Sequence, residues 1–199
     1  MKEIVLASSS PRRRELLTLV GIPHRVQPAE IDEALLPDEE PVAHVQRLAL
    51  EKAAAVSRTL ATDQRETTVL AADTIVVLDG EVLGKPRSEQ EACEMIRRLA
   101  GRSHTVHTAV AVVRGDRTVS RVDSVGVTFR ALDEAEIAAY VATGEPMDKA
   151  GAYGIQGYGA TIVRCVEGDF FAVMGLGLVA VVELLAEVGL VYSFGVAES

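Results

Sequence analysis

Near its N-terminus the chain reads Leu6-Ala-Ser-Ser-Ser10-Pro11-Arg12-Arg13-Arg14-Glu15-Leu16-Leu17, which predicts a strand, a serine-rich turn and a helix start in that order. The strand is expected over Lys2–Leu6, because a short apolar run is typical of a buried strand. Ser10 is a favourable N-cap, and Pro11 suits the first helical position because its missing N–H needs no partner there. Gly21 is expected to end the helix.

This turn is suited to hold an anion. Ser8 and Ser10 offer hydroxyl groups, and backbone N–H groups are exposed at the helix N-terminus, where the helix dipole is positive. Arg12 and Arg13 stand beside it. A phosphate is the most plausible anion, although an ordinary capped helix with solvated arginines explains the same pattern equally well.

The composition narrows the class of protein. A chain of 199 residues predicts one large domain, or one domain with two lobes. A formal net charge of -9 argues against general binding to nucleic acid or to an anionic membrane surface, which needs a basic face. An anionic substrate would therefore need a local basic site, and the arginines of the N-terminal turn fit this requirement.

Cysteine usage and hydropathy point to a cytoplasmic protein. Cys93 and Cys165 form no CxxC pair, so we expect two buried, reduced thiols rather than a zinc cluster or a disulfide. No signal peptide is expected at the N-terminus, and the most apolar stretch, 173–182, is too short to span a bilayer. The tail over about 190–199 is expected to be loosely held.

Asp73 is the strongest single candidate for a functional residue. The run Thr68–Leu78 is almost entirely apolar and predicts a central strand that is buried on both faces, yet Asp73 interrupts it. A buried, unpaired carboxylate costs several kcal/mol, so Asp73 is expected to have a partner, a metal ion or a raised pKa. Asp79-Gly80 predicts a hairpin turn, and Lys85 follows it.

Other charged residues leave two interpretations open. Glu30, Asp32 and Glu33 lie close together, and their carboxylates could hold a hard divalent cation, although a solvated acidic loop is the simpler interpretation. Pro41–Leu60 has helical periodicity, and Lys52 lies on or near its apolar stripe. Lys52 is either an edge residue that extends to solvent or a cation held for a phosphate.

The remaining elements follow from periodicity and capping. Ser88 caps an expected helix over Glu89–Leu99, and Asp133 caps another that runs to Val141. The expected strands are 24–27, 105–113, 118–129 and 160–166, and the final helix is 178–188. His24, His44, His104 and His107 are interpreted as structural residues.

The segment Gly144–Gly159 is unusual. It holds a high density of glycines with two tyrosines and is expected to form no regular element. Long loops of this kind are usually functional or disordered, and Tyr153, Ile155 and Tyr158 argue against disorder. The amide of Gln156 has both donors and an acceptor, which suits the edge of a nucleobase.

These motifs together resemble the Maf family of nucleotide pyrophosphatases, within the ITPase-like superfamily. The resemblance runs from Leu6 to about Leu185. It rests on separate motifs in the family's order, namely Ser8–Leu17, Ile31-Asp32-Glu33, Glu51-Lys52-Ala53, Ala71-Ala-Asp73-Thr74, Gly84-Lys85-Pro86 and Gly144–Gly157. Two positions depart from the family pattern, since Gly177 stands where proline is usual and Ala172 where asparagine is frequent.

The resemblance implies the fold and the reaction. The implied fold is α/β, a twisted mixed β-sheet flanked by helices, with one Maf-like domain over 1–199 and two lobes around a substrate cleft. The implied enzyme is a homodimer that cuts a nucleoside triphosphate between the α and β phosphorus atoms and releases pyrophosphate. It needs a divalent cation, which could be Mg²⁺, Mn²⁺ or Co²⁺.

The resemblance also implies roles for individual residues. Asp73 matches the catalytic acid/base, and Asp73 with Glu33 is assigned to the metal, with Glu30 or Asp32 as helpers. The groups expected to hold phosphate oxygens are Ser8, Ser10, Arg13, Lys52 and Lys85. One carboxylate cannot easily be both a full metal ligand and a free base, so the division of roles at Asp73 stays open.

Arg12, Thr74 and Gln156 match the branch of the family that acts on dTTP and UTP. Glutamine can pair with the N–H and one carbonyl of uracil or thymine, and arginine can donate to the other carbonyl. Three alternatives remain: the branch acting on methylated guanine triphosphate, a regulator of septum formation that binds nucleotide without turnover, and an RNA-binding module. The low aromatic content, 4%, disfavours the last of these.

Overall fold

The computed structural model describes residues 1–61 and 66–194. Its longer helices are α1 (Pro11–Leu19), α2 (Pro41–Thr59), α3 (Glu89–Leu99), α4 (Glu134–Ala142), α5 (Phe170–Met174) and α6 (Leu178–Glu187). Its strands are β1 (Ile4–Leu6), β2 (His24–Val26), β3 (Val69–Leu78), β4 (Glu81–Leu83), β5 (Ser103–Arg114), β6 (Arg117–Phe129) and β7 (Val163–Glu167). The predicted strands and helices occur in the predicted order, whereas α5 was not predicted.

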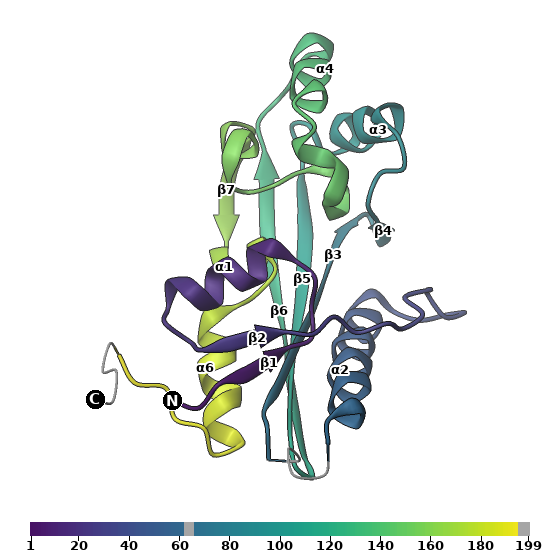
Figure 1. The fold of residues 1–199 in the computed structure, drawn as a ribbon. Coiled ribbons are helices and arrows are strands. Elements are labelled where there is room, and N and C mark those ends of the chain that lie inside the picture. Colours follow the sequence, from purple (N-terminus) through teal and green to yellow (C-terminus); the bar gives the residue numbers. More distant parts are fainter. Residues whose placement is uncertain (62–65, 195–199) are drawn as a thin grey trace. The chain divides into compact units, whose positions relative to one another are not determined.

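All seven strands belong to one mixed sheet (Figure 1). The order is β2-β1-β3-β5-β6-β7, and β4 pairs with β3 away from this path. β1 runs parallel to both β2 and β3, whereas the β3–β4 and β6–β7 pairs are antiparallel. The parallel neighbours need a crossover connection, and α1 supplies it between β1 and β2. The α/β fold class with a mixed sheet and flanking helices is therefore confirmed.

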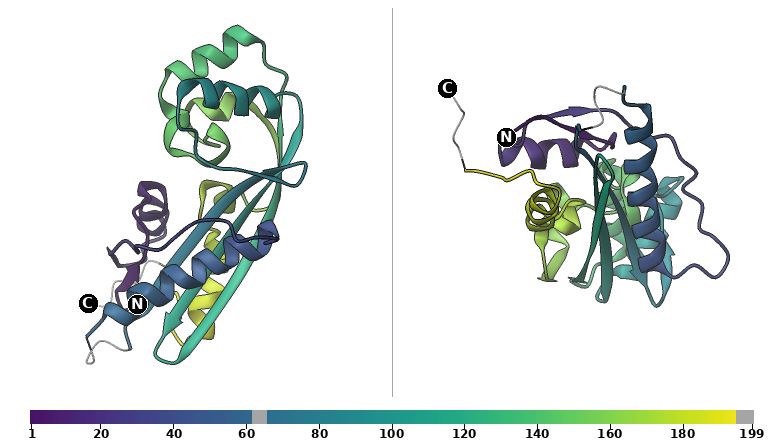
Figure 2. Two further views of the ribbon diagram at one scale, coloured as in Figure 1. Left: turned by 90° about the vertical axis from the view of Figure 1, so that its right-hand side faces the viewer. Right: turned by 90° about the horizontal axis from the view of Figure 1, so that it is seen from below.

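The chain forms two compact units, and β3, β5 and β6 contribute residues to both. The first unit holds the described residues of Met1–Asp73 and Thr108–Val122 and the chain from Gly175 onward. In it, α2 lies on one face of the strands and α6 on the other, as the right-hand view of Figure 2 shows. β1 is fully buried, as expected for a strand that is covered on both faces.

The second unit holds Thr74–His107 and Asp123–Met174. In its core, α3 and α4 pack with the C-terminal half of β3, the N-terminal end of β5 and the C-terminal end of β6. Its aromatic side chains come from Phe129, Tyr140 and Tyr153. The predicted caps of α3 and α4 are present, since Ser88 Oγ accepts from Glu91 N and Asp133 forms a capping box with Glu136. The predicted hairpin turn is also present, with positive φ at Asp79 and Gly80.

Three predictions outside the candidate site were wrong. The segment 144–159 is not irregular throughout, because it contains the 3₁₀ turns Glu145–Asp148 and Ala150–Ala152 and most of a third, Gly157–Thr161. Gly144, Gly151 and Gly157 adopt positive φ and let these turns follow one another closely. The strand expected from Ala160 begins only at Val163, because the third turn occupies the preceding residues. Cys165 is exposed rather than buried.

The two departures from the family pattern lie in well-defined backbone. Gly177 is the N-cap of α6 with φ of -66°, a value that proline also adopts, so glycine here does not change the backbone course. Ala172 is fully buried in α5.

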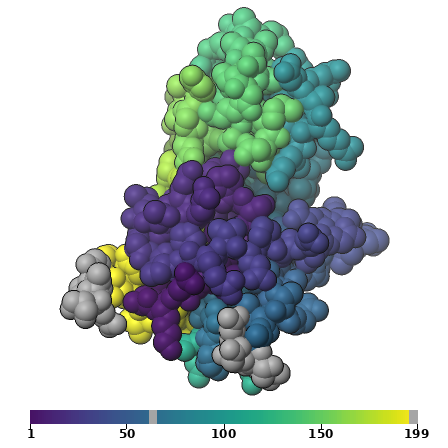
Figure 3. Space-filling view, in the orientation of Figure 1, coloured from purple at the N-terminus to yellow at the C-terminus, as the bar shows by residue number. Residues whose placement is uncertain are grey.

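Two further features concern the surface. The segment joining β2 to α2 projects from the surface (Figure 3), and Leu35 and Leu36 on it are exposed. Of the predicted loose tail, 195–199 lies outside the described residues, whereas Tyr192 Oη donates to Val20 O at 2.8 Å. Among the described residues, no helix is long and apolar enough to cross a membrane.

Candidate active site

Asp73 and Lys52 form a buried ion pair in the first unit. Asp73 lies within β3, and Lys52 lies on the face of α2 that packs on the sheet, beside Leu48 and Ala49. Lys52 Nζ is 2.7 Å from Asp73 Oδ1, and the two side chains are only 10% and 11% exposed. The expectation that Asp73 has a partner is confirmed. The interpretation of Lys52 as an edge residue is wrong, because its ammonium is held inside by this pair.

Glu33 completes a bridge through the same ammonium. Glu33 Oε1 lies 2.6 Å from Lys52 Nζ, although its side chain is 58% exposed. Lys52 therefore contacts a buried carboxylate and a largely exposed carboxylate at once. The single positive charge lies between two acceptors whose own repulsion would otherwise be unfavourable.

Arg47 holds the segment that carries Glu33 through several hydrogen bonds. Its Nη2 donates to Ala34 O at 3.0 Å, directly after Glu33, and its guanidinium binds Glu39 through Nε and Nη2 at 2.6 and 2.8 Å. His44 Nδ1 and Leu36 N also contact the Glu39 carboxylate. Hydrogen bonds from Arg47, followed by those from Leu36 and His44, lower the pKa of Glu39 to about 2. The carboxylate thus stays charged and holds the segment at neutral pH.

Arg13 and Ser8 lie at the N-terminal turn of the same unit. Arg13 Nη1 donates to Ser8 Oγ at 3.0 Å, and Arg13 Nε donates to Gly175 O at 2.8 Å. Burial lowers the pKa of Arg13 and outweighs the opposing attraction of Asp73 and Glu33. The guanidinium nevertheless remains charged at neutral pH. It is held by neutral oxygen atoms and lies in the field of the two carboxylates.

The side-chain cap predicted for Ser10 is not formed, and Ser8 makes the hydrogen bonds of the turn instead. Ser10 is the N-cap of α1, but its side chain makes no capping hydrogen bond. Instead Ser8 Oγ accepts from Ser10 N at 3.2 Å while it also accepts from Arg13. The turn is therefore preorganised by the Ser8 hydroxyl. Arg12 is half-buried, and its charge further lowers the pKa of Arg13.

Thr74, Lys85 and Gln156 belong to the second unit. Thr74 follows Asp73 along β3, and Lys85 is exposed after β4. Gln156 is half-buried and precedes the turn Gly157–Thr161. Within the first unit the structure brings together Ser8, Arg13, Glu33, Lys52 and Asp73. Glu30 is exposed, and Asp32 Oδ1 accepts from Ala34 N at 3.0 Å, a local turn contact.

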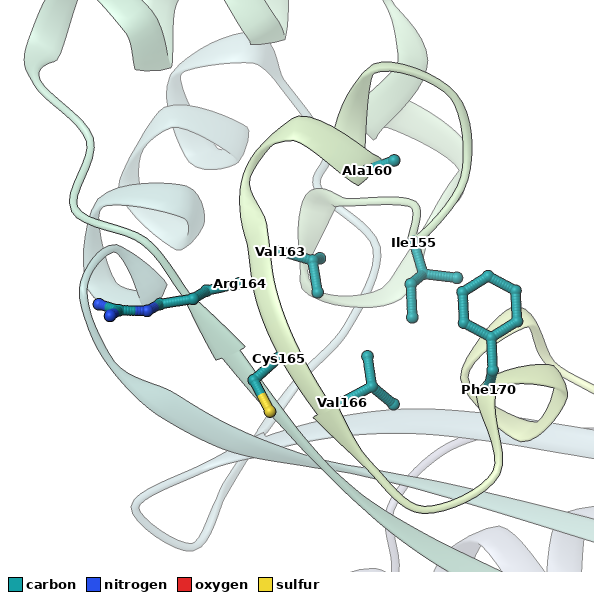
Figure 4. Close-up of a pocket in the computed structure, with 7 residues that line it drawn as sticks. All are labelled: Ile155, Ala160, Val163, Arg164, Cys165, Val166 and Phe170. Carbon is teal, nitrogen blue, oxygen red and sulfur yellow. The ribbon is translucent and has the colours of Figure 1, made fainter.

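An apolar hollow lies beside the Gln156 loop in the second unit. Its lining comprises Ile155, Ala160, Val163, Arg164, Cys165, Val166 and Phe170. In Figure 4, Ile155 and Phe170 point toward each other, whereas Arg164 points away. Apart from the exposed thiol of Cys165, the lining side chains carry no acid or nucleophile, so the hollow holds no catalytic set of its own.

The donor set of the first unit fits a hard divalent cation. Within residues 1–61 and 66–194, no three His, Cys, Asp or Glu side chains are placed to share a metal ion. The pair Asp73 and Glu33 already surrounds one cationic group, the Lys52 ammonium. Mg²⁺ is commonly held by one or two carboxylates together with substrate phosphates, so two carboxylate donors suffice for such a site.

Sequence reasoning missed several residues that organise these regions. Arg47 and Glu39 hold the Glu33 segment, and the Gly175 carbonyl anchors Arg13. A weak signal was available for Arg47, since helical spacing places it one turn from His44 and Glu51. No local signal points to Gly175, which is 162 positions from Arg13.

Known proteins are similar to this chain over nearly its whole length. A family model described as "Maf-like protein" matches residues 3–188. The chain is 53% identical to the dTTP/UTP pyrophosphatase of Moorella thermoacetica, over 95% of this chain and 96% of that protein. It is 50% identical to the protein of the same name from Symbiobacterium thermophilum, over 95% of both. For that from Aquifex aeolicus the identity is 44%, over 94% of this chain and 96% of that protein.

One solved structure, "The structure of the Staphylococcus aureus Ham1 protein", aligns with a TM-score of 0.49 and 17% identity, over 81% of this chain and 80% of that chain.

Proposed function

Because the chain belongs to the Maf family, we propose that it hydrolyses dTTP and UTP between the α and β phosphorus atoms. The products are the nucleoside monophosphate and pyrophosphate. The names of the similar curated proteins support this choice of substrate. The structural observation that carries the proposal is the Lys52 ammonium between Asp73 and Glu33, near the charged Arg13.

The cations of the site would bind the triphosphate. A triphosphate carries about four negative charges near neutral pH, and phosphoryl transfer depends largely on positioning and on neutralising such charge. We assign phosphate oxygens to Arg13, Lys52 and Lys85, with Ser8 and Ser10 supplying hydroxyl and N–H donors. Arg13 is the best preorganised of these, since two neutral oxygen atoms already fix its guanidinium.

Asp73 and Glu33 would hold the divalent cation. A bound cation supplies neutralisation of the phosphate charge and orientation of its oxygens. Asp73 would also orient or deprotonate the attacking water, since a carboxylate is a suitable general base. Lys52 has to release one carboxylate to contact a phosphate oxygen, and its flexible stem allows that change.

Arg12, Thr74 and Gln156 would select the base. Uracil and thymine present an N–H donor between two carbonyl acceptors. A glutamine amide complements the donor and one acceptor, and an arginine complements the other. A cytosine or adenine edge would leave these groups mispaired, which is costly at a site built for hydrogen bonding.

The test is pyrophosphate release from a panel of dTTP, UTP, CTP, ATP, GTP and methylated GTP, each with Mg²⁺, Mn²⁺ or Co²⁺. We expect preferred turnover of dTTP and UTP by the wild type and a loss of about a hundredfold or more in Asp73→Asn. Asp79→Asn is the matched control, because Asp79 is an exposed hairpin residue paired with Arg102.

Each alternative has its own outcome in this test. Preferred turnover of methylated GTP would assign the chain to that branch. Nucleotide binding with no turnover of any triphosphate would support a non-catalytic regulator. We also propose that the active form is a homodimer, and sedimentation analysis across protein concentrations tests this separately.

A further inference from the structure

The Glu145 carboxylate accepts several hydrogen bonds within the glycine-rich loop of the second unit. Its Oε1 accepts from Tyr140 Oη at 2.9 Å and from Gly159 N at 2.9 Å. Its Oε2 accepts from Tyr158 N at 2.8 Å. Three donors from two different segments therefore converge on one carboxylate. Two of them are the backbone N–H groups of the turn that follows Gln156.

Tyr140 fixes the backbone on the other side of Gln156. Its hydroxyl oxygen accepts from Gly154 N at 3.2 Å while its proton is donated to Glu145. Tyr140 lies on α4 and is buried, so its ring is held by the core of the unit. The backbone is thus tied at 154 and at 158–159, and Gln156 lies at the centre of the tied stretch.

Glycine is required where the loop backbone approaches the Glu145 carboxylate and the Gly154 carbonyl. A Cβ atom at Gly157 would lie 2.4 Å from Glu145 Oε2, and φ there is +70°. A Cβ atom at Gly159 would lie 1.8 Å from Gly154 O. The two glycines let the backbone come close enough to donate to the carboxylate. The hydrogen bonds to Glu145 therefore depend on glycine at these two positions.

We propose that Glu145 is a positioning residue for base selection, acting by holding the loop that presents the Gln156 amide. This inference rests on the proposed function, in which Gln156 pairs with uracil or thymine. A side-chain amide discriminates between bases only if its donor and acceptor are held in a fixed direction. A carboxylate suits the task because both of its oxygens accept, whereas a glutamine at this position would present an NH₂ group to an N–H donor.

The experiment compares kcat/KM for UTP and CTP in wild type, Gln156→Ala, Glu145→Gln and Tyr140→Phe, with thermal unfolding of each protein. Glu134→Gln is the matched control, because Glu134 is an exposed glutamate of the same unit paired with Arg97. We expect the UTP preference over CTP to fall about tenfold or more in Glu145→Gln and to fall in Gln156→Ala, while CTP turnover persists. Tyr140→Phe removes one hydroxyl and should reduce the preference in the same direction.

The outcomes separate the inference from the proposed function. Equal losses for UTP and CTP in Glu145→Gln, with an unchanged ratio, would mean a purely structural role and would overturn the inference alone. If Glu145→Gln does not fold, an unchanged ratio in folded Tyr140→Phe has the same meaning. A wild type without preference for uracil or thymine would overturn the proposed function and the inference with it.

Discussion

At the scale of single residues, the site depends on Lys52. Its ammonium is placed where an apolar helix face meets the sheet, a position at which a lysine is costly unless paired. Asp73 is equally costly there without Lys52. Each residue is tolerated because of the other, and Glu33 adds a second acceptor from a flanking segment. The pair is therefore tolerated by the fold rather than a source of stability, as expected for part of the proposed site.

A double-mutant cycle tests this account. Lys52→Met leaves the Asp73 carboxylate buried without its partner and should lower the free energy of unfolding by about 3 kcal/mol. Adding Asp73→Asn should restore much of this loss, because the unpaired charge is then removed. Urea unfolding at pH 7 measures the four proteins, and Lys85→Met, at an exposed lysine, serves as the control. Additive losses in the double variant would contradict the coupling.

His104 should make stability depend on pH. Its ring packs edge-on against Phe129 and Tyr153, its Nε2 contacts Tyr153 Oη at 2.7 Å, and burial lowers its pKa to about 4. As the pH falls, His104 takes up a proton near pH 6.5 in the unfolded chain but only near pH 4 in the folded chain. Neutral His104 therefore contributes fully to the free energy of unfolding above pH 6.5. This contribution, roughly 3 kcal/mol in total, is lost as the pH falls to 4.

The variant His104→Phe isolates this effect. It retains a ring for the edge-on contacts but cannot titrate, so its free energy of unfolding should fall less steeply than that of the wild type between pH 6.5 and 4. Urea unfolding at several pH values gives both slopes. All other titrating groups are shared and cancel in the difference. Identical slopes would show that His104 does not carry the pH dependence.

At the scale of elements, α2 organises the site from two of its faces. Lys52 projects toward β3. Arg47 lies nearer the N-terminus of the same helix and binds the segment between β2 and α2. One helix thus sets the positions of Asp73's partner and of Glu33. Most other residues of the segment are exposed, so the Glu39–Arg47 cluster is expected to hold it in place.

Arg47→Lys should weaken binding of the divalent cation. Lysine keeps the charge but cannot bind Glu39 through two donors and also reach Ala34 O, so Glu33 loses its fixed position. We expect the half-saturating Mg²⁺ concentration to rise about tenfold, with a smaller change in kcat at saturating Mg²⁺. Pyrophosphate release and calorimetric Mg²⁺ titration measure the two effects. In the control Arg97→Lys, at an exposed pair with Glu134, neither value should change.

At the scale of the whole molecule, substrate binding should stabilise the fold. A ligand that binds only the folded chain at one hundred times its Kd adds about 2.7 kcal/mol. For a chain of this size that corresponds to a rise in Tm of about 5–10 °C. We expect this rise for a UTP analogue with an α,β-methylene bridge plus Mg²⁺, and a much smaller rise for the CTP analogue. Scanning calorimetry measures both, and equal rises would contradict base selection in the ground state.

The sequence by itself determined the order of elements and most of their boundaries. Ser88, Asp133 and the pair Asp79-Gly80 act through backbone groups a few residues away, so their signals are local and were interpreted correctly. The apolar run around Asp73 likewise identified a buried carboxylate. The turns within 144–159 were missed because closely spaced glycines give no periodic signal, and their geometry depends on contacts of the Glu145 and Tyr140 side chains with backbone N–H groups 13 or 14 positions further along the chain.

Only the tertiary structure decided which charged groups meet. Lys52 and Asp73 are 21 positions apart, and Arg13 and Gly175 are 162 apart. Such contacts depend on how helices pack on the sheet, which residue spacing along the chain does not encode. For the same reason the sequence left Lys52 with two interpretations, whereas packing of α2 against β3 makes an ion pair with Asp73 the arrangement that avoids an unpaired buried charge.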